Sequence, residues 1–217
     1  MKKINSQIAF NSKFTDDLSK SPRAQQSKRR RAEILQASVS VLMQGYTDYS
    51  LRKVAAVAGV RINTVQHHFG DLEALILATS EFILNDFMSR IRSLAVGQHN
   101  SPIDDLMAFF DEAWIAINDM NIRRFMFELW SMGLHRPIIA QAIERSYAEY
   151  RRLVSEIILR INPELTDTEV QAVAFLICSW TEGMQIMSEW CYSDQASISL
   201  MSECVKKACV GLISKHK

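Results

Sequence analysis

Glycine and proline are scarce in this sequence, with seven and four residues in a chain of 217. Such a composition disfavours a protein of short strands and turns and favours long helices. No apolar run is long enough to span a bilayer, and the N-terminus lacks the apolar core of a signal peptide. We therefore expect a soluble, cytoplasmic protein with no membrane partner. Hydrophobic residues make up 48% of the chain, which is enough for a sizeable core.

Catalytic and cofactor motifs are also missing. The sequence contains no recognisable pairing of a nucleophile with a base, no paired carboxylates that stand out from solvated faces, no Gly-rich phosphate loop and no HExxH. These absences remove the reasons to propose an enzyme or a bound cofactor. We therefore expect neither.

The cysteines lack the CxxC spacing of zinc and redox sites. They are Cys178, Cys191, Cys204 and Cys209. In a cytoplasmic helical protein, such residues are typically reduced and packed in the core. A redox-sensing role stays open as the alternative, and it would be tested first at Cys204 and Cys209 because Lys206 and Lys207 lie near them.

Two adjacent histidines, His67 and His68, raise the question of a metal site. Neighbours on a helix point about 100° apart, so these two rings do not converge on one ion as an i, i+4 pair does. His99, His135 and His216 have no partner at ligand spacing. We expect no metal site.

The stretch from Ser50 to Phe69 reads as two short helices joined by a tight turn. Ser50 is a suitable N-cap, because its hydroxyl can accept a hydrogen bond from an N–H of the first turn. Apolar residues then recur at helical spacing up to Ala58. Gly59 follows, where a left-handed backbone would end the helix. This order of elements is that of a helix-turn-helix, whose second helix enters the DNA major groove.

The second of these helices, from about Arg61, has two distinct faces. Ile62, Val65 and Phe69 recur at i, i+3 and i+7 and predict a buried side. The other face carries polar residues that can hydrogen-bond base edges or phosphates. They are Asn63, Thr64, Gln66 and His67.

Over about residues 30–81 the sequence resembles the DNA-binding domain of TetR-type (tetracycline-repressor-like) regulators. The shared features are the Ala-Gly-Val turn that ends at Val60, a seven-residue recognition helix that ends in His68-Phe69, and Gly-Asp-x-Glu-x-Leu from Gly70. Two positions differ. Members often have an aromatic residue where Gln66 stands and a lysine where Leu72 stands, and both touch phosphate.

The resemblance implies a ligand-responsive regulator, expected to be a repressor that binds a palindromic DNA operator as a homodimer. A small apolar effector would bind the second domain and release the operator. The alternative is an interaction protein on the same fold that binds a protein partner and has lost DNA specificity. The residues expected to contact DNA are Lys28, Arg29, Arg30, Arg31, Ser50, Arg52, Arg61, Ile62, Asn63, Thr64, Gln66, His67 and His68.

Charge is distributed unevenly along the chain. Residues 1–80 hold twelve Lys and Arg against six Asp and Glu, a net charge of +6, whereas the rest of the chain has a net charge of −5. The positive half therefore coincides with the helix-turn-helix, as a phosphate-binding surface requires.

Helical periodicity and capping signals predict an all-α protein of about nine helices. Residues 1–27 are polar and are expected to form a flexible arm, with the first helix starting near Ser27. Residues 28–75 would form the three-helix DNA-binding domain. Residues 76–217 would form a helical domain for ligand binding and dimerisation.

The second half is rich in aromatic and methionine residues, which line adaptable apolar pockets as well as helix–helix cores. Glu128 and Glu182 lie within apolar helices, where a carboxylate must be paired, reach water or await a cationic ligand. The residues expected to bind a ligand are Phe110, Trp114, Met126, Glu128, Trp130, Trp180, Glu182 and Met184.

The last two helices are expected to form the dimer interface as a four-helix arrangement about a two-fold axis. Each is expected to present an apolar stripe that its own subunit cannot cover. The stripes are Val170, Val173, Ala174 and Ile177 on one helix, and Met201, Val205, Ala208 and Leu212 on the other.

Overall fold

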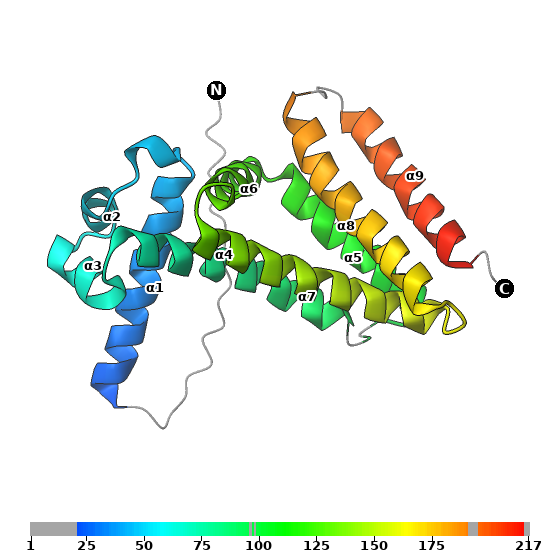
Figure 1. The fold of residues 1–217 in the computed structure, drawn as a ribbon, viewed down its shortest axis with the longest axis horizontal. Helices are drawn as coiled ribbons and strands as arrows, with labels where there is room; N and C mark the ends of the chain where they lie inside the picture. Colours follow the sequence, from blue (N-terminus) through cyan, green and yellow to red (C-terminus); the bar gives the residue numbers. More distant parts are fainter. Residues whose placement is uncertain (1–20, 96, 98, 191–194, 215–217) are drawn as a thin grey trace.

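The structure, a computed structural model, describes residues 21–95, 97, 99–190 and 195–214. Within them it contains nine α-helices, one 3-10 turn and no strand, which confirms the all-α prediction (Figure 1). The elements are α1 (Pro22–Leu42), η1 (Tyr46–Asp48), α2 (Leu51–Val57), α3 (Ile62–Phe69), α4 (Leu72–Ala95), α5 (Pro102–Asn118), α6 (Met120–Gly133), α7 (Pro137–Ile161), α8 (Asp167–Trp190) and α9 (Gln195–Ser214).

The helices form two groups that are connected by two long helices, α4 and α7. α1, α2 and α3 lie at one end of the molecule and α5, α8 and α9 at the other, while α4 and α7 pack against each other between them (Figure 1). None of the described helices is both long and apolar enough to cross a membrane.

The helix-turn-helix forms as its sequence predicts. The Ser50 hydroxyl accepts a hydrogen bond from the Lys53 N–H at 3.2 Å and caps α2. Gly59 has φ +64°, the left-handed conformation that lets the chain turn from α2 into α3. Val54 on α2 and Val65 on α3 are both fully buried, so the two helices are held together by their apolar sides.

The first helix begins earlier than expected. α1 starts at Pro22, where Ser21 accepts a hydrogen bond from the Ala24 N–H, and not near Ser27. A serine cap followed by proline at the first helical position is a strong start signal, and it outweighs the polar composition of residues 22–27. The rest of the expected arm, residues 1–20, lies outside the described residues.

The core at the helix-turn-helix end is not confined to that end. It runs through α1 to α4 and continues into α6, where Phe125, Leu129 and Met132 join it. A buried hydroxyl network also connects α1 to α4, because Ser38 bonds both the Tyr49 hydroxyl and Thr79, the latter at 2.6 Å. The packing therefore crosses the domain boundary expected at residue 75.

A second connection between the two ends involves Arg136, which immediately precedes α7. Its guanidinium donates a hydrogen bond to the Tyr46 hydroxyl and lies 5.5 Å from the centre of that ring. The same group is 3.7 Å from the Glu73 carboxylate in the first turn of α4. The corner between α6 and α7 is thus attached directly to the helix-turn-helix end.

The second core lies among α4, α5, α7, α8 and α9. Phe109 and Tyr150 are at its centre, with ring centroids 5.6 Å apart. At its surface, Arg92 of α4 makes two hydrogen bonds of 2.7 and 2.9 Å to the Glu149 carboxylate of α7. These bonds lower the pKa of Glu149 and tie the two long helices together.

The prediction of which face of α8 lies uncovered is wrong. A capping box starts this helix, with Glu169 accepting from the Thr166 N–H at 2.8 Å. However, Val170, Ala174 and Ile177 are buried in the second core of their own subunit. α8 is apolar on two sides, so periodicity alone finds two stripes and does not say which one faces inward.

The exposed stripe of α8 lies on the opposite side and contains Phe175, Leu176, Ile186, Met187 and Trp190. On α9, Met201, Val205 and Leu212 are partly buried and Ala208 is exposed. This helix therefore keeps part of its predicted stripe at the surface.

Candidate nucleic-acid interface and buried cavity

The outward face of α3 is polar and accessible. Arg61, Asn63, Gln66 and His67 are exposed. Ile62 is 37% exposed, so the prediction that it belongs to the buried side with Val65 and Phe69 is wrong. It stands at the first position of α3, where the side chain lies at the edge of the core. Thr64 and His68 are partly buried. Burial of Val65 and Phe69 fixes the rotation of the helix about its axis, and so determines which side chains are presented outward.

Two residues around α2 complete this surface. Arg52 is exposed, so its guanidinium is free to reach a phosphate or a guanine edge. The Ser50 oxygen already caps α2, which leaves its hydroxyl proton for a phosphate. Leu72, which stands where related proteins often have a phosphate-binding lysine, packs against the first core instead.

The basic run of α1 is arranged beside the recognition helix. Arg31 lies over the Phe69 ring, 4.8 Å from its centre. Arg29 and Arg30 both pair with Glu33, at 3.1 and 2.8 Å. Exposed pairs of this kind contribute little free energy, so phosphate groups can compete for both guanidinium groups.

His68 is the partly buried member of the histidine pair. Burial lowers its pKa, and the positive charges of His67, Arg31 and Arg30 lower it further. A phosphate placed beside this ring would act in the opposite direction, because a negative charge favours the protonated imidazole. Within the described residues, no group of three or more His, Cys, Asp or Glu side chains is placed to hold a metal.

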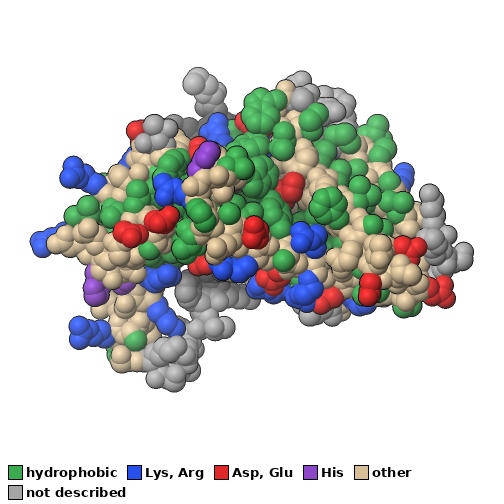
Figure 2. Space-filling model, viewed as in Figure 1, with side chains coloured by type: hydrophobic (Ala, Val, Ile, Leu, Met, Phe, Trp, Pro, Cys, Tyr) green, Lys and Arg blue, Asp and Glu red, His purple; other side chains and the backbone are tan. Residues whose placement is uncertain are grey.

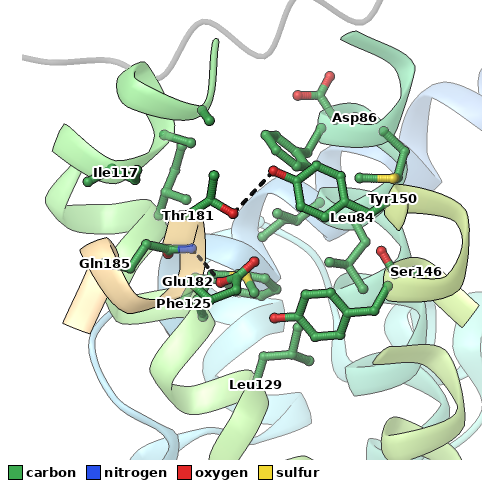
Figure 3. A pocket seen from close by; sticks show the side chains of 18 of the residues that line it. Leu84, Asp86, Ile117, Phe125, Leu129, Ser146, Tyr150, Thr181, Glu182 and Gln185 are labelled. Carbon is green, nitrogen blue, oxygen red and sulfur yellow. Dashed lines mark hydrogen bonds between the residues drawn. The ribbon is translucent and has the colours of Figure 1, made fainter. Parts of the chain in front are cut away.

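A largely apolar cavity lies among α4, α5, α6, α7 and α8 (Figure 3). Its volume is about 70 Å³, several times what one water molecule needs. Most of its walls are aliphatic or aromatic, with Phe125 and Leu129 of α6 opposite Leu84 of α4 and Tyr150 of α7. Such a space suits a small organic molecule.

Polar atoms are gathered on the α8 side of the cavity. Thr181 donates to the Cys178 carbonyl at 2.8 Å and accepts from the Tyr150 hydroxyl at 3.3 Å. Gln185 donates to the Glu182 carboxylate at 2.7 Å (Figure 3). The Tyr147 hydroxyl, which accepts from the Trp130 indole at 2.8 Å, also hydrogen-bonds Glu182.

Burial raises the pKa of Glu182 to about 7, and the hydrogen bond from Tyr147 opposes this only in part. Among the described residues, no Lys, Arg or His pairs with this carboxylate. Burial also raises the pKa of the Cys178 thiol to about 12 and that of Cys209 to about 11. Neither cysteine therefore has the thiolate that a redox sensor needs.

Replacing Glu182 by glutamine should remove a pH dependence of stability. The folded carboxyl binds its proton more tightly than the unfolded one, whose pKa is 4.5. The free energy of unfolding of the wild type therefore falls as pH rises from 4.5 to 7 and is constant above, a loss of about 2–3 kcal/mol between pH 5 and 8. Urea titrations of both proteins at these two pH values measure it.

Glu128→Gln is the matched control, because Glu128 lines neither the cavity nor the groove beside it. It should keep the pH dependence of the wild type. If Glu182→Gln shows the same decline in stability as the wild type, Glu182 is not the buried titrating group.

The residues expected to bind a ligand are not all brought together. Met126 and Glu182 line the cavity, whereas Trp130 lies in the outer groove next to it. The remaining candidates line neither space. Phe110 belongs to the second core and contacts Trp180 edge to face, with ring centroids 5.4 Å apart. Met184 is buried, and Trp114 and Glu128 are partly buried.

Most of the cavity residues are not among those expected from the sequence, and they include the polar residues Tyr147, Tyr150, Thr181 and Gln185. In the sequence the two tyrosines belong to an apolar stripe and carry no further signal. Thr181, Glu182 and Gln185 form a polar cluster inside an otherwise apolar helix, and this local pattern could have identified the α8 wall.

Comparisons with known proteins agree with this architecture. No protein-family model matches the chain. The chain is 24% identical over 168 residues to the HTH-type transcriptional regulator BetI of Burkholderia lata, covering 75% of this chain and 84% of that protein. A TetR transcription regulator from Haloarcula marismortui superposes with a TM-score of 0.70 at 16% identity, covering 87% of this chain and 98% of that one. The SmeT–triclosan complex gives a TM-score of 0.61 at 16% identity, covering 75% and 81%.

The structure combines an all-helical fold with an exposed helix-turn-helix. More particularly, the chain has the fold of the TetR-family regulators, which confirms the resemblance seen in the sequence. The curated relatives that it matches are named as transcriptional regulators.

Proposed function

We propose that the chain is a homodimeric repressor that leaves a palindromic operator when a small molecule enters the cavity. The observation that carries this proposal is the composition of the cavity wall, which includes six side chains of α4. The first turns of α4 pack against the recognition helix α3. A molecule in the cavity therefore touches the helix that positions the DNA-reading surface.

On DNA, α3 would lie in the major groove with Asn63 and Thr64 at base edges and Arg61 and Ile62 beside them. Ser50, Gln66, His67 and His68 would contact the sugar–phosphate backbone. The basic run of α1 would add phosphate or minor-groove contacts. The test is to measure the affinity for DNA from the regions that flank the gene of this protein, at several salt concentrations.

Replacing Asn63, Thr64 or Arg52 by alanine should weaken operator binding by about 1–3 kcal/mol per lost base contact. Asn63→Ala should also relax specificity at one position of the operator. Stability should change little, because Asn63 and Arg52 are exposed and Thr64 is only partly buried. Fluorescence anisotropy against the operator and single-base variants measures both effects.

Asn85→Ala and Arg124→Ala are matched controls at exposed positions outside the recognition surface. They should bind the operator like the wild type. If the three variants of the recognition surface also do so, the assignment of α3 to the DNA is wrong.

The small-molecule part of the proposal is supported by the cavity and by the SmeT–triclosan complex, in which a protein of the same fold is bound to a small molecule. An effector that binds the DNA-incompetent state more tightly lowers operator affinity. The largest possible reduction equals the ratio of the effector's affinities for the two states. Operator release by a panel of amines, neutral aromatics and fatty acids tests this part. If no small molecule changes operator affinity, the regulator is not controlled through this cavity.

Dimerisation is proposed through the exposed stripe of α8 together with α9. Figure 2 shows hydrophobic side chains gathered on the face where these helices lie. Phe175 is 63% exposed and Trp190 is 70% exposed. Groups of large exposed apolar side chains are typical of an interface, and a two-fold axis would pair the same surface of two subunits.

A further inference from the structure

Glu182 and Gln185 stand one turn apart on α8 and both line the cavity. The Gln185 amide nitrogen lies 2.7 Å from a Glu182 carboxylate oxygen. This contact fixes the orientation of the amide, because the reverse orientation would place two acceptor oxygens against each other. The Gln185 carbonyl oxygen consequently points away from Glu182 (Figure 3).

That carbonyl oxygen is buried and has no hydrogen-bond partner among the residues that the structure describes. Gln185 itself is only 7% exposed. Glu182 is contacted by two neutral donors, the Gln185 amide and the Tyr147 hydroxyl. The cavity wall thus presents a carboxylate and a carbonyl side by side, and both can accept further hydrogen bonds.

The other charged groups around the cavity leave this carboxylate without a cation. Arg90 of α4 is held by Asp86 at 2.6 Å and by Glu112 of α5 at 2.5 Å. Arg151 of α7 lines the outer groove together with Glu182, but it makes no ion pair with it. The described wall residues therefore carry more negative than positive charge.

Aromatic rings surround the same space. Phe87, Tyr147 and Tyr150 line the cavity with Phe125, and the centroids of Phe87 and Tyr150 are 5.8 Å apart. The faces of such rings attract cations, most strongly where water is excluded. The rings and the acceptor pair thus favour the same kind of ligand.

We propose that the cavity binds a small protonated amine with at least two N–H groups, one donated to the Glu182 carboxylate and one to the Gln185 carbonyl. Aromatic rings and a carboxylate alone would accept a quaternary ammonium ion equally well. The unpaired carbonyl of Gln185 distinguishes a protonated amine from a quaternary ammonium ion. A quaternary ion has no N–H to donate and would leave this carbonyl buried and unsatisfied. This inference rests on the proposed function in taking the cavity as the effector site.

Calorimetric titration of the full-length protein with n-butylammonium, n-butyltrimethylammonium and 1-butanol tests the proposal without DNA. Butylammonium should bind about tenfold or more tightly than the quaternary ion, which follows from one hydrogen bond to a charged donor. Butanol should bind more weakly than butylammonium. Equal or tighter binding of the quaternary ion or of butanol would overturn the proposal, as would the absence of any binding by butylammonium.

Three variants assign the contacts. Glu182→Gln should lose most of the affinity for butylammonium, and Gln185→Met should lose the preference for the primary amine over the quaternary ion. Glu128→Gln, a carboxylate outside the cavity, should bind like the wild type. Thermal melts confirm that each variant is folded. Unchanged binding in Glu182→Gln or an unchanged preference in Gln185→Met would contradict the assignment.

An operator-release assay with the same three molecules separates this inference from the proposed function. If butylammonium binds through Glu182 but leaves operator affinity unchanged, the amine site stands and the effector role fails. If amines do not bind while another apolar molecule releases the operator through the cavity, the effector role stands and the amine site fails.

Discussion

Charges placed in the exposed stripe of α8 should separate the dimer and abolish tight operator binding. The variant Leu176→Glu/Trp190→Glu puts two carboxylates per subunit where the wild type exposes apolar side chains, 49% and 70% exposed. Across a two-fold axis, each charge would face apolar surface or its own copy, and burying it unpaired is unfavourable. A monomer can engage only one half-site of a palindrome. Affinity should therefore fall by about 1,000-fold or more, the low end of the ratio between specific and non-specific binding.

Analytical ultracentrifugation and anisotropy measure the two consequences on the same samples. Leu134→Glu is the control, because Leu134 is 82% exposed at the corner after α6 and lies far along the chain from α8. It should remain a dimer and bind normally. A wild-type protein that sediments as a monomer at micromolar concentration would refute the interface.

Replacing Leu42 by alanine should destabilise the protein by about 2–5 kcal/mol. Leu42 ends α1, is fully buried and belongs to the core that joins the helix-turn-helix to α4 and α6. Its truncation removes apolar contacts and leaves a space that the packed neighbours fill only in part. Because domains are stable by about 5–15 kcal/mol in total, the loss should be visible as a large shift of the urea midpoint.

Leu134→Ala makes the same chemical change at an exposed position. Its effect on the free energy of unfolding should stay within about 0.5 kcal/mol. Similar losses for the two variants would mean that Leu42 is not part of a packed core.

The helix-turn-helix is predictable because its signals are local. A serine cap, a glycine that must adopt positive φ and an i, i+3, i+7 stripe each act within one or two turns, and Ser50, Gly59 and Val65 all behave in the structure as the sequence predicts. The start of α1 differs from its prediction although its cap is also local. The polar composition of residues 22–27 favours an arm, and the Ser21-Pro22 pair overrides it.

The cavity could not be located from the sequence because its walls come from helices far apart in the chain. The sequence favours tryptophans over tyrosines as wall residues, yet Trp180 packs beside the second core while Tyr147 and Tyr150 face the cavity. The same limit applies to α8, where Ile177 and Leu176 are adjacent and equally apolar. Only the packing against α5 and α7 determines that Ile177 is inside and Leu176 is outside.

The contact of Arg136 with Tyr46 and Glu73 limits how the two ends of the molecule can move. α4 is one connection between them, the packed core that continues into α6 is a second, and Arg136 adds a third at the corner before α7. The helix-turn-helix end is therefore held from several directions. A ligand that moves this end must either break the contacts of Arg136 or repack the shared core.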